Sequence, residues 1–512
     1  MKKIYLCLII VLLSAPWYCY SQDYTEQELQ QLSKLFFIDD SLLVSDATNS
    51  RFLSPIRKVA PTAAFQYEQI ALPYSTLATN TSNRVLFLVN ATEYMELTSH
   101  ILQYAEDIRT FHGYEVDLEV VSNATCKDIK QRILVNSNHL LGVVLIGDID
   151  VALFELPNDH SEYGYKNWPC DLYYMDLDGV WTDSDNNGIF DSHTGDIQPE
   201  IFVGRISATN IGNQKDEIKA LANFFERDHS YWVSCIHNVH QALSYTNKDW
   251  INSKDIVSGI NNLYGVENTG HFGYGSCANF GKSIYCDLQD SYYTIIQLAA
   301  HSNPYLHEFT NNANTKEYLY VNTISNMRKH ILGYNLFCCS ACNWLATSSM
   351  GYLGGAYLFN NTSALFVIGS TKTGSMLGFE SFYKPLNEGV SVGEAMLDWW
   401  NTYPKRYDKI SRISWFYGLS LLGDPFIKPV REKYCSPTLR LEKFDNSRLS
   451  FLASFAPSTT FHYKATKKII VSKNFTIPTG LRVIFDAPIV EFENNFVCPK
   501  EATLETHSTG CN

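Results

Sequence analysis

Residues 295–302 have the sequence Ile295-Ile296-Gln297-Leu298-Ala299-Ala300-His301-Ser302, and residues 335–343 have the sequence Asn335-Leu336-Phe337-Cys338-Cys339-Ser340-Ala341-Cys342-Asn343. Each stretch begins with a short apolar run, which is typical of a buried strand, and continues into a reactive side chain, His301 or Cys342. The carboxyl ends of parallel strands meet at one edge of a sheet, where open α/β proteins bind their ligands. The two stretches therefore predict an α/β fold in which His301 and Cys342 form a dyad.

Predicted strands and helices alternate on both sides of these stretches. Strands are predicted at 85–89, 116–121, 140–146, 201–204, 238–245, 295–300, 332–339 and 364–370, and helices at 94–110, 126–135, 213–228 and 249–264. Short apolar strands that alternate with helices indicate a mostly parallel sheet covered by helices on both faces. We expect this α/β domain to span residues 83–430, with two subdomains that meet near 205–235.

The two ends of the chain have a different character. Lys2 and Lys3 precede an apolar run, and small residues precede Gln22, which predicts a bacterial-type signal peptide over residues 1–21. Residues 22–82 contain no strong strand and are predicted to be a leader or pro-segment. Short alternating runs spaced by turn signals predict a small all-β module over residues 431–512, either a sandwich or a short solenoid.

Composition limits the class of protein. The chain has 512 residues, 45% hydrophobic and 18% charged, which is the composition of a globular protein. Its 40 Lys and Arg against 53 Asp and Glu give a net charge of −13, which argues against nucleic-acid binding. No stretch after the signal peptide approaches the roughly 18 apolar residues of a membrane span. We expect a secreted, periplasmic or cell-surface protein, with residues 431–512 able to associate with the cell surface.

A cysteine and a histidine at neighbouring strand ends can carry out acyl transfer. An imidazole that removes the thiol proton creates a strong nucleophile, and the same imidazole then protonates the leaving amine. The alternative is thiol-disulfide exchange, because Cys339 and Cys342 form a Cys-x-x-Cys motif between a predicted strand and a possible helix. That alternative gives no role to His301.

Further motifs accompany the dyad in a fixed order along the chain. They are Val143-Val144-Leu145-Ile146-Gly147-Asp148, Asp171-Leu172-Tyr173-Tyr174 with Leu177-Asp178-Gly179, Pro199-Glu200-Ile201-Phe202-Val203-Gly204-Arg205-Ile206, and Leu421-Leu422-Gly423-Asp424-Pro425. With this ordered set, the chain resembles the gingipain-type cysteine peptidases, peptidase family C25 of the caspase-like clan, from about Val85 to Val430.

The resemblance implies roles for individual residues. Cys342 would be the nucleophile and His301 the general base, and the backbone N–H groups of Cys342 and Ser302 would bind the oxyanion. The acid that orients the histidine would follow the strand ending near Tyr245, with Asp249 as the nearest candidate and Asp255 as the next. Protein or peptide substrates are implied, and gingipains select Arg or Lys before the cut.

The sequence departs from the family pattern at one position of the expected site. The family has glycine after the catalytic histidine, whereas this chain has Ser302. A serine side chain could crowd the substrate carbonyl, or exclude a backbone angle that only glycine adopts. The alternative to an active endopeptidase is therefore a surface or binding protein that keeps the peptidase fold with impaired catalysis.

A separate motif predicts a structural calcium ion. The run Asp183-Ser184-Asp185-Asn186-Asn187-Gly188-Ile189-Phe190-Asp191 matches an EF-hand loop at positions 1, 3, 5, 6 and 9. The expected ligands are the side chains of Asp183, Asp185, Asn187 and Asp191 and the carbonyl of Ile189. Thr194 occupies position 12, where the EF-hand has a bidentate glutamate, and the alternative is an ion-free Asx-rich turn.

Overall fold

The structure is a computed structural model of the full chain. It describes residues 24–25, 27–29, 63–72, 83–157, 159–160, 166–212, 214–233, 240–272, 281–289, 293–346, 351–360, 362–430, 438–441, 460–477, 482–500 and 502–508. The predicted signal peptide, residues 1–21, lies outside the described residues, as does most of the predicted leader.

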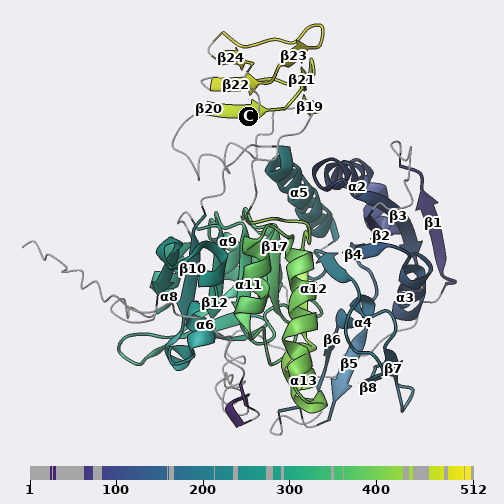
Figure 1. Ribbon diagram of the computed structural model, residues 1–512, viewed down its shortest axis with the longest axis vertical. Helices are drawn as coiled ribbons and strands as arrows, with labels where there is room; N and C mark the ends of the chain where they lie inside the picture. Colours follow the sequence, from purple (N-terminus) through teal and green to yellow (C-terminus); the bar gives the residue numbers. More distant parts are fainter. Residues whose placement is uncertain are drawn as a thin grey trace, which may run out of the picture.

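A large, mainly parallel sheet runs through the molecule (Figure 1). Among the described residues it has eleven strands, in the order β1-β3-β2-β4-β9-β18-β17-β16-β12-β10-β11. The strands are β1 (Gln66–Ile70), β2 (Arg84–Asn90), β3 (Glu115–Ser122), β4 (Leu140–Ile146), β9 (Phe202–Ile206), β10 (Ala242–Thr246), β11 (Thr269–Phe272), β12 (Ile295–Ala299), β16 (Gly333–Phe337), β17 (Phe366–Ser370) and β18 (Leu419–Gly423). Only the β1–β3 and β17–β18 pairs are antiparallel within this sheet.

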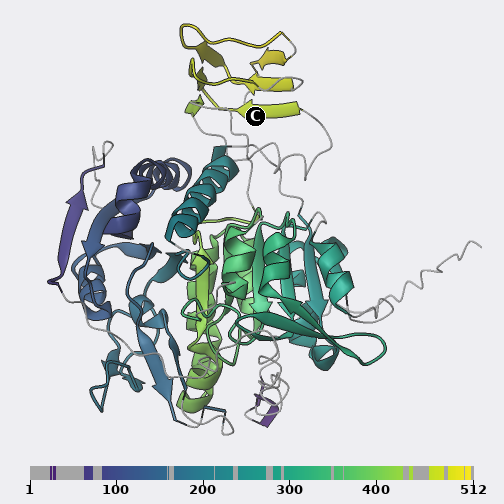
Figure 2. The ribbon, with the colours of Figure 1, turned by 180° about the vertical axis from the view of Figure 1, so that it is seen from behind.

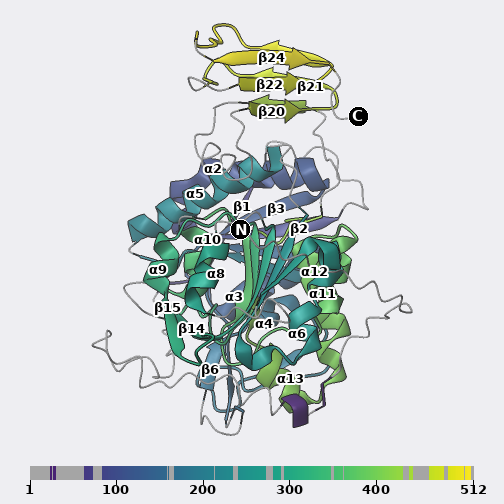
Figure 3. The ribbon, with the colours of Figure 1, turned by 90° about the vertical axis from the view of Figure 1, so that its left-hand side faces the viewer.

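Helices cover both faces of the sheet, so the α/β class predicted from the sequence is confirmed. Figure 3 shows α8 (Lys282–Leu288), α9 (Val321–Asn326) and α10 (Leu353–Phe359) on one side of the sheet and α6 (Lys254–Ser258), α11 (Phe379–Asn387) and α12 (Val392–Thr402) on the other. All five residues of β12, β16 and β17 are buried. Strands covered on both faces need continuous apolar runs, which explains why these strands have no polar alternation.

Local sequence signals explain several helix boundaries. Thr125 and Asp128 form a reciprocal capping box, and α3 spans Cys126–Val135 as predicted. The single helix predicted over residues 249–264 is wrong. Ser253 caps α6 with its side chain, Gly259 ends it, and α7 (Asn261–Tyr264) follows as a separate short turn.

The two halves of the sheet meet at β9 and β18. Arg205 and Leu422 are the one residue pair in register between these strands. Immediately after β18, Asp424 accepts a hydrogen bond of 2.7 Å from the Tyr104 hydroxyl of α2 (Ala91–His112) and one of 2.8 Å from the Phe426 N–H. This junction of β9 and β18 lies at the start of residues 205–235, where the two subdomains were predicted to meet. Side chains from both halves of the sheet hold it together.

The predicted leader contributes to this fold. Residues 66–70 form β1, which pairs with β3 at the edge of the sheet, so the absence of a strand before Arg84 was wrongly predicted. Tyr24 and Leu29 are buried against the main core. The Tyr24 hydroxyl lies 2.5 Å from Ser253 Oγ, and the Tyr24 N–H donates to the Tyr407 hydroxyl at 3.2 Å. Residue 82 is therefore not a structural boundary.

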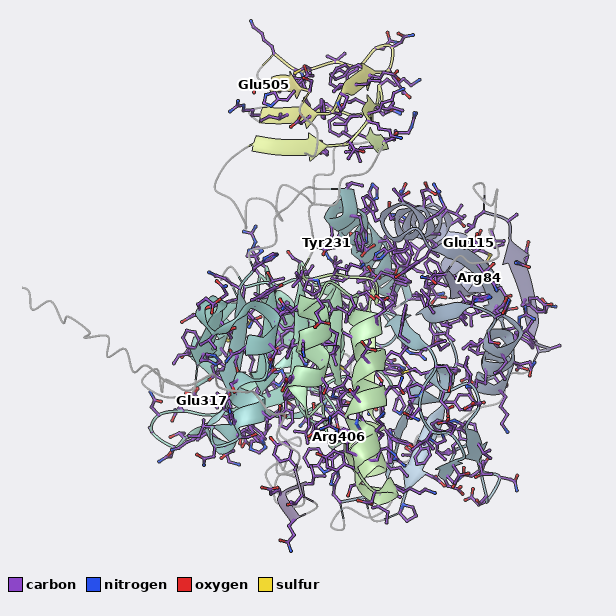
Figure 4. All side chains as sticks on the ribbon, viewed as in Figure 1. Arg84, Glu115, Tyr231, Glu317, Arg406 and Glu505 are labelled. Carbon is purple, nitrogen blue, oxygen red and sulfur yellow. The ribbon has the colours of Figure 1, made fainter. Side chains whose placement is uncertain are left out.

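The C-terminal module lies beyond α5 (Gln214–Val233) at one end of the molecule (Figures 1 and 2). Its strands are β19 (Thr438–Leu441), β20 (Thr460–Lys464), β21 (Lys468–Val471), β22 (Arg482–Asp486), β23 (Ile489–Phe492) and β24 (Thr503–His507). Every second strand pairs in parallel, as β19-β21-β23 and β20-β22-β24. This connectivity is that of a short solenoid, and Arg482 pairs with Glu505 at 2.7 Å across adjacent coils. Figure 4 labels Glu505 on this module.

Candidate active site

The predicted reactive residues lie at the carboxyl ends of β10, β12 and β16. These three strands are neighbours, and their last residues are in register, Thr246 with Ala299 and Ala299 with Phe337. Asp249 follows β10, His301 follows β12, and the cysteines follow β16. Parallel pairing thus brings three chain segments to one edge of the sheet, as expected from the two sequence stretches.

Asp249 and His301 form a hydrogen-bonded pair. His301 Nε2 lies 2.8 Å from Asp249 Oδ2, and this hydrogen bond is the main reason why the pKa of Asp249 is lowered. A carboxylate can only accept, so Nε2 carries the proton and Nδ1 of a neutral imidazole is left with its lone pair. Nδ1 is buried and has no hydrogen-bond partner among the described residues. That nitrogen is available as a general base.

Aromatic packing fixes the histidine ring on one face of the sheet. The Trp250 ring centroid lies 4.4 Å from that of His301 and 5.9 Å from that of Phe337. Phe337 in turn contacts Phe379 at the start of α11, with ring centroids 6.1 Å apart. His301 therefore lies on the face of the sheet that α6 and α11 cover.

Asp255, the second candidate for the orienting acid, has a different function. It is buried in α6, and its carboxylate accepts the N–H groups of Gly378 and Phe379 at 2.8 and 3.1 Å. Burial raises the pKa of Asp255 to about 7. Its contacts hold the beginning of α11, so Asp249 is the acid that the structure brings to His301.

Cys342 lies on the opposite face of the sheet from His301. Its sulfur packs directly against Gly354 of α10 and Gly369 of β17. A Cβ atom on Gly354 would lie only 2.9 Å from this sulfur, and one on Gly369 only 2.7 Å. The side chain is fully buried, and burial is the main cause that raises its pKa. Its backbone N–H donates to the Ser370 carbonyl at 3.0 Å. These contacts do not favour Cys342 as nucleophile or as oxyanion donor, and that assignment stays a prediction.

The alternation of side chains along β16 explains this outcome. Asn335 and Phe337 face His301, since Asn335 Nδ2 lies 3.2 Å from Met376 Sδ in the loop before α11. Cys338 faces the other way and hydrogen-bonds Ser302 on the α10 side, where it also raises the pKa of Cys342. Cys339 lies beyond the end of the strand, in the turn that also contains Ser340.

Cys339 is the alternative candidate for the nucleophile at the end of β16. The Gly374 N–H, two residues before Met376, hydrogen-bonds its sulfur, although burial raises the pKa of the thiol overall. Its own N–H has no acceptor among the described residues. Ser340, with φ of 54°, turns the chain sharply after it. Sequence reasoning missed Cys339 because β16 was expected to extend through it, whereas the strand ends at Phe337.

Ser302 fits where the family has glycine. Its φ is not in the left-handed region, and its side chain points away from His301, with Oγ 2.6 Å from His307 Nδ1. Ala300 N–H donates to Phe337 O at 3.4 Å, toward β16. Along an extended strand, successive N–H groups point to alternate sides, and Ser302 is two residues after Ala300. The Ser302 N–H therefore points to the same side as the Ala300 N–H, toward the end of β16. The serine therefore neither crowds the histidine face nor removes the backbone donor.

The predicted calcium loop is completed by a residue that the sequence did not single out. Carboxylate oxygens of Asp185, Asp191 and Glu155 all lie within 4.8 Å of one another. Asn187 Nδ2 contacts Glu155 and Asp185, while Asp183 accepts the N–H groups of Asn187 and Gly188. Glu155 comes from β5 (Leu153–Leu156).

Backbone contacts explain how Glu155 reaches the loop. Its N–H donates to the Phe190 carbonyl at 2.8 Å, and the Phe190 N–H donates to the Leu153 carbonyl at 2.9 Å. This pairing brings the Glu155 carboxylate to Asp185 and Asp191 of a loop whose position 12 is Thr194, in β8 (Ser192–Thr194). The oxygen donors fit a hard cation such as Ca²⁺. No spacing rule within the loop could have indicated Glu155.

Comparison with known proteins finds a matching family model and a similar solved structure. The model of peptidase family C25 matches residues 119–430. Among solved structures, the crystal structure of the Arg-specific cysteine proteinase gingipain R (RGPB) matches with 14% identity, covering 70% of this chain and 83% of that chain, with a TM-score of 0.48. No curated protein matches the sequence. Within the described residues, no helix is long and apolar enough to cross a membrane.

The Asp249–His301 pair predicts a specific effect of substitution. Replacing Asp249 by Asn removes the acceptor that holds the Nε2–H tautomer, so turnover of fluorescein-labelled casein should fall about 100-fold or more. The midpoint of thermal unfolding should change little, because Asp249 is partly exposed. Steady-state kinetics and calorimetry measure the two effects. Glu267→Gln is the control, and equal turnover in both variants would contradict the assignment.

Proposed function

The chain belongs to peptidase family C25 and is a cysteine-type peptidase, and from this premise we propose that it is an exported endopeptidase that uses Cys339, His301 and Asp249. The observation that carries the proposal is the Asp249–His301 hydrogen bond of 2.8 Å beside the end of β16. Protein or peptide substrates follow from the family. The resemblance identified in the sequence is confirmed at this level.

The proposed reaction is acyl transfer to a thiol. His301 Nδ1 takes the proton of Cys339, whose sulfur attacks the scissile carbonyl, and Asp249 stabilises the imidazolium that forms. The N–H groups of Cys339 and Ser302 donate to the developing oxyanion. His301 then protonates the leaving amine, and water hydrolyses the thioester. Removing one such backbone-type donor typically costs about 3 to 4 kcal/mol of transition-state stabilisation.

The two rival functions have less support. Disulfide exchange needs Cys339 and Cys342 to bond each other, but both are free thiols with different neighbours: Cys342 packs against Gly354 and Gly369, and Cys339 accepts the Gly374 N–H. A catalytically impaired binding protein was suggested by Ser302. The orientation of the Ser302 side chain toward His307 removes the steric reason for impairment. Neither rival uses the Asp249–His301 pair.

Substrate preference is proposed from the family alone. Gingipains select Arg or Lys before the cut, and we carry this preference over as an expectation. Asp159 is an acid close enough to affect the Cys339 thiol, but it is buried and paired with Lys372, with Nζ and Oδ2 2.8 Å apart. An acid neutralised within the protein is not a good candidate to bind a basic substrate side chain.

The location of the protein and the roles of its ends are part of the same proposal. Residues 1–21 would direct export, which leaves a secreted, periplasmic or cell-surface enzyme. The solenoid of residues 431–512 would associate with the cell surface. Residues 22–82 would act as a leader, and the contacts of Tyr24 support an inhibitory role because Ser253 follows closely after Trp250, which packs on His301.

We also propose that the loop of residues 183–191 binds a structural Ca²⁺. Asp183, Asp185, Asn187 and Asp191 would supply side-chain oxygens and Ile189 its carbonyl. Glu155 would add the carboxylate that the loop itself lacks. Rotation of the Asn187 amide would present Oδ1 instead of Nδ2 to the same point. Millimolar extracellular calcium would suit a site of modest affinity.

Separate cysteine substitutions test the nucleophile. Cys339→Ala should abolish labelling by a peptidyl acyloxymethyl ketone and lower casein turnover by about 10³-fold or more. Cys342→Ala should remain labelled and active, and lose about 1 to 3 kcal/mol of unfolding free energy because it leaves a cavity beside two glycines. Mass spectrometry of the labelled protein identifies the site. Labelling that depends on Cys342 instead would overturn the assignment.

Calcium binding should appear as a change in stability. At a calcium concentration about 100 times the Kd, ligand binding adds about 2.7 kcal/mol, so the unfolding midpoint should rise on adding CaCl₂ and fall with EDTA. Glu155→Gln should remove most of this response. Glu388→Gln, at the end of α11, should retain it. A Glu155→Gln variant with the wild-type calcium response would exclude Glu155 as a ligand.

Leader removal tests the proposed inhibition. A chain that begins at residue 83 should turn over casein faster than the chain that begins at residue 22. Loss of β1 would expose the edge of β3, so the unfolding midpoint of both chains should be recorded alongside. Tyr24→Phe, which removes the contact with Ser253 and leaves β1 intact, should also raise turnover. Unchanged turnover in Tyr24→Phe and the truncated chain would contradict inhibition.

A further inference from the structure

A line of buried, hydrogen-bonded side chains begins at Ser302, on the face of the sheet opposite His301. Ser302 Oγ is 2.6 Å from His307 Nδ1, His307 Nε2 is 3.1 Å from the Tyr357 hydroxyl, and that hydroxyl is 2.8 Å from the Tyr285 hydroxyl. All four side chains are buried. The line connects α8 and α10 to the residue that follows the catalytic histidine.

The hairpin that carries His307 determines where the Ser302 N–H points. β13 (His301–Asn303) pairs with β14 (Leu306–Thr310), and Pro304 and Tyr305 alone connect them. A two-residue connection makes Asn303 and Leu306 the hydrogen-bonded pair next to the turn. Ser302 and His307 are then the following non-hydrogen-bonded pair. Their side chains come close together, and the Ser302 N–H points away from β14.

The charge state of this line of residues is constant over the working range of a peptidase. Burial lowers the pKa of His307 to about 3 and raises the pKa values of Tyr285 and Tyr357 well above their usual range. Cys338, which also contacts Ser302, has its pKa raised to about 12, mainly by burial. Neutral groups that neither gain nor lose a proton can hold a position but do not carry charge to the site.

We propose that His307, held by Tyr357, is a positioning residue that anchors the Ser302 side chain and thereby aims the Ser302 N–H at the oxyanion. The inference rests on the proposed function. It gives a role to the serine that replaces the family glycine, since a glycine offers no side chain to hold. A glycine backbone is conformationally free, whereas in this chain a buried hydrogen bond restrains the Ser302 side chain. Misplacing such a donor lowers kcat rather than substrate binding.

A double-substitution cycle tests the proposal on the full chain. His307→Phe and Ser302→Ala should each lower kcat for fluorescein-labelled casein about 10-fold, with KM changed less than 2-fold. Because both remove the same hydrogen bond, the double variant should be no slower than the slower single variant. His307→Gln keeps a donor and an acceptor and should recover part of the lost kcat.

Alkylation of Cys339 separates positioning from general disruption. Iodoacetamide reacts with the thiolate without forming an oxyanion, so His307→Phe should react at the wild-type rate. Tyr357→Phe should lower kcat, whereas Tyr417→Phe, which removes a hydroxyl 2.7 Å from His193 Nδ1, is the matched control and should not. A fall of kcat and alkylation together, or additive effects in the double variant, would show a merely structural role and overturn the proposal.

Failure of the proposed function would look different. Wild-type protein that neither cleaves casein nor reacts with the peptidyl ketone at Cys339 would remove the peptidase assignment and the positioning role with it. Active wild-type protein with normal kcat in His307→Phe would overturn only the role of His307. Each outcome therefore identifies which of the two inferences has failed.

Discussion

The parallel, in-register pairing of β10, β12 and β16 is the constraint on which the rest of the site depends. Burial of apolar strands on both faces holds these strands together, and the register brings the residues after Thr246, Ala299 and Phe337 to one edge. Asp249 and His301 meet there although 52 positions separate them. A slip of one residue would send each following side chain to the opposite face, so the chemistry needs the register as much as it needs the residues.

The sheet also separates two functions by face. His301 lies toward α6 and α11, where Trp250 packs on the imidazole and Phe337 contacts both Trp250 and Phe379. Ser302, Cys338 and Cys342 lie toward α10, where their side chains are packed or hydrogen-bonded. One face therefore carries reactive groups, and the other supports the backbone from which they project.

Polar groups inside the molecule are paired in the same manner elsewhere. Arg205 binds Asp171 through two nitrogens at 2.7 and 2.9 Å at the seam between the halves of the sheet, and Asp424 accepts two hydrogen bonds nearby. Glu155 reaches the 183–191 loop through backbone pairing between Leu153 and Phe190. Buried charges and hydrogen-bonding groups are costly unless satisfied, which explains why motif residues of the sequence recur at these junctions.

The sequence by itself determined the α/β class, the helix Cys126–Val135, the strand Leu140–Ile146 and the family, because these depend on local periodicity, capping and ordered motifs. Asp249 was named from its place after a strand, and only the fold distinguished it from Asp255. The proposal of Cys339 rather than Cys342 rests on tertiary structure alone, since the direction of each sulfur depends on where β16 ends and on the turn at Ser340. It also brought Glu155 to a distant loop and His307 to Ser302, contacts that no spacing along the chain encodes.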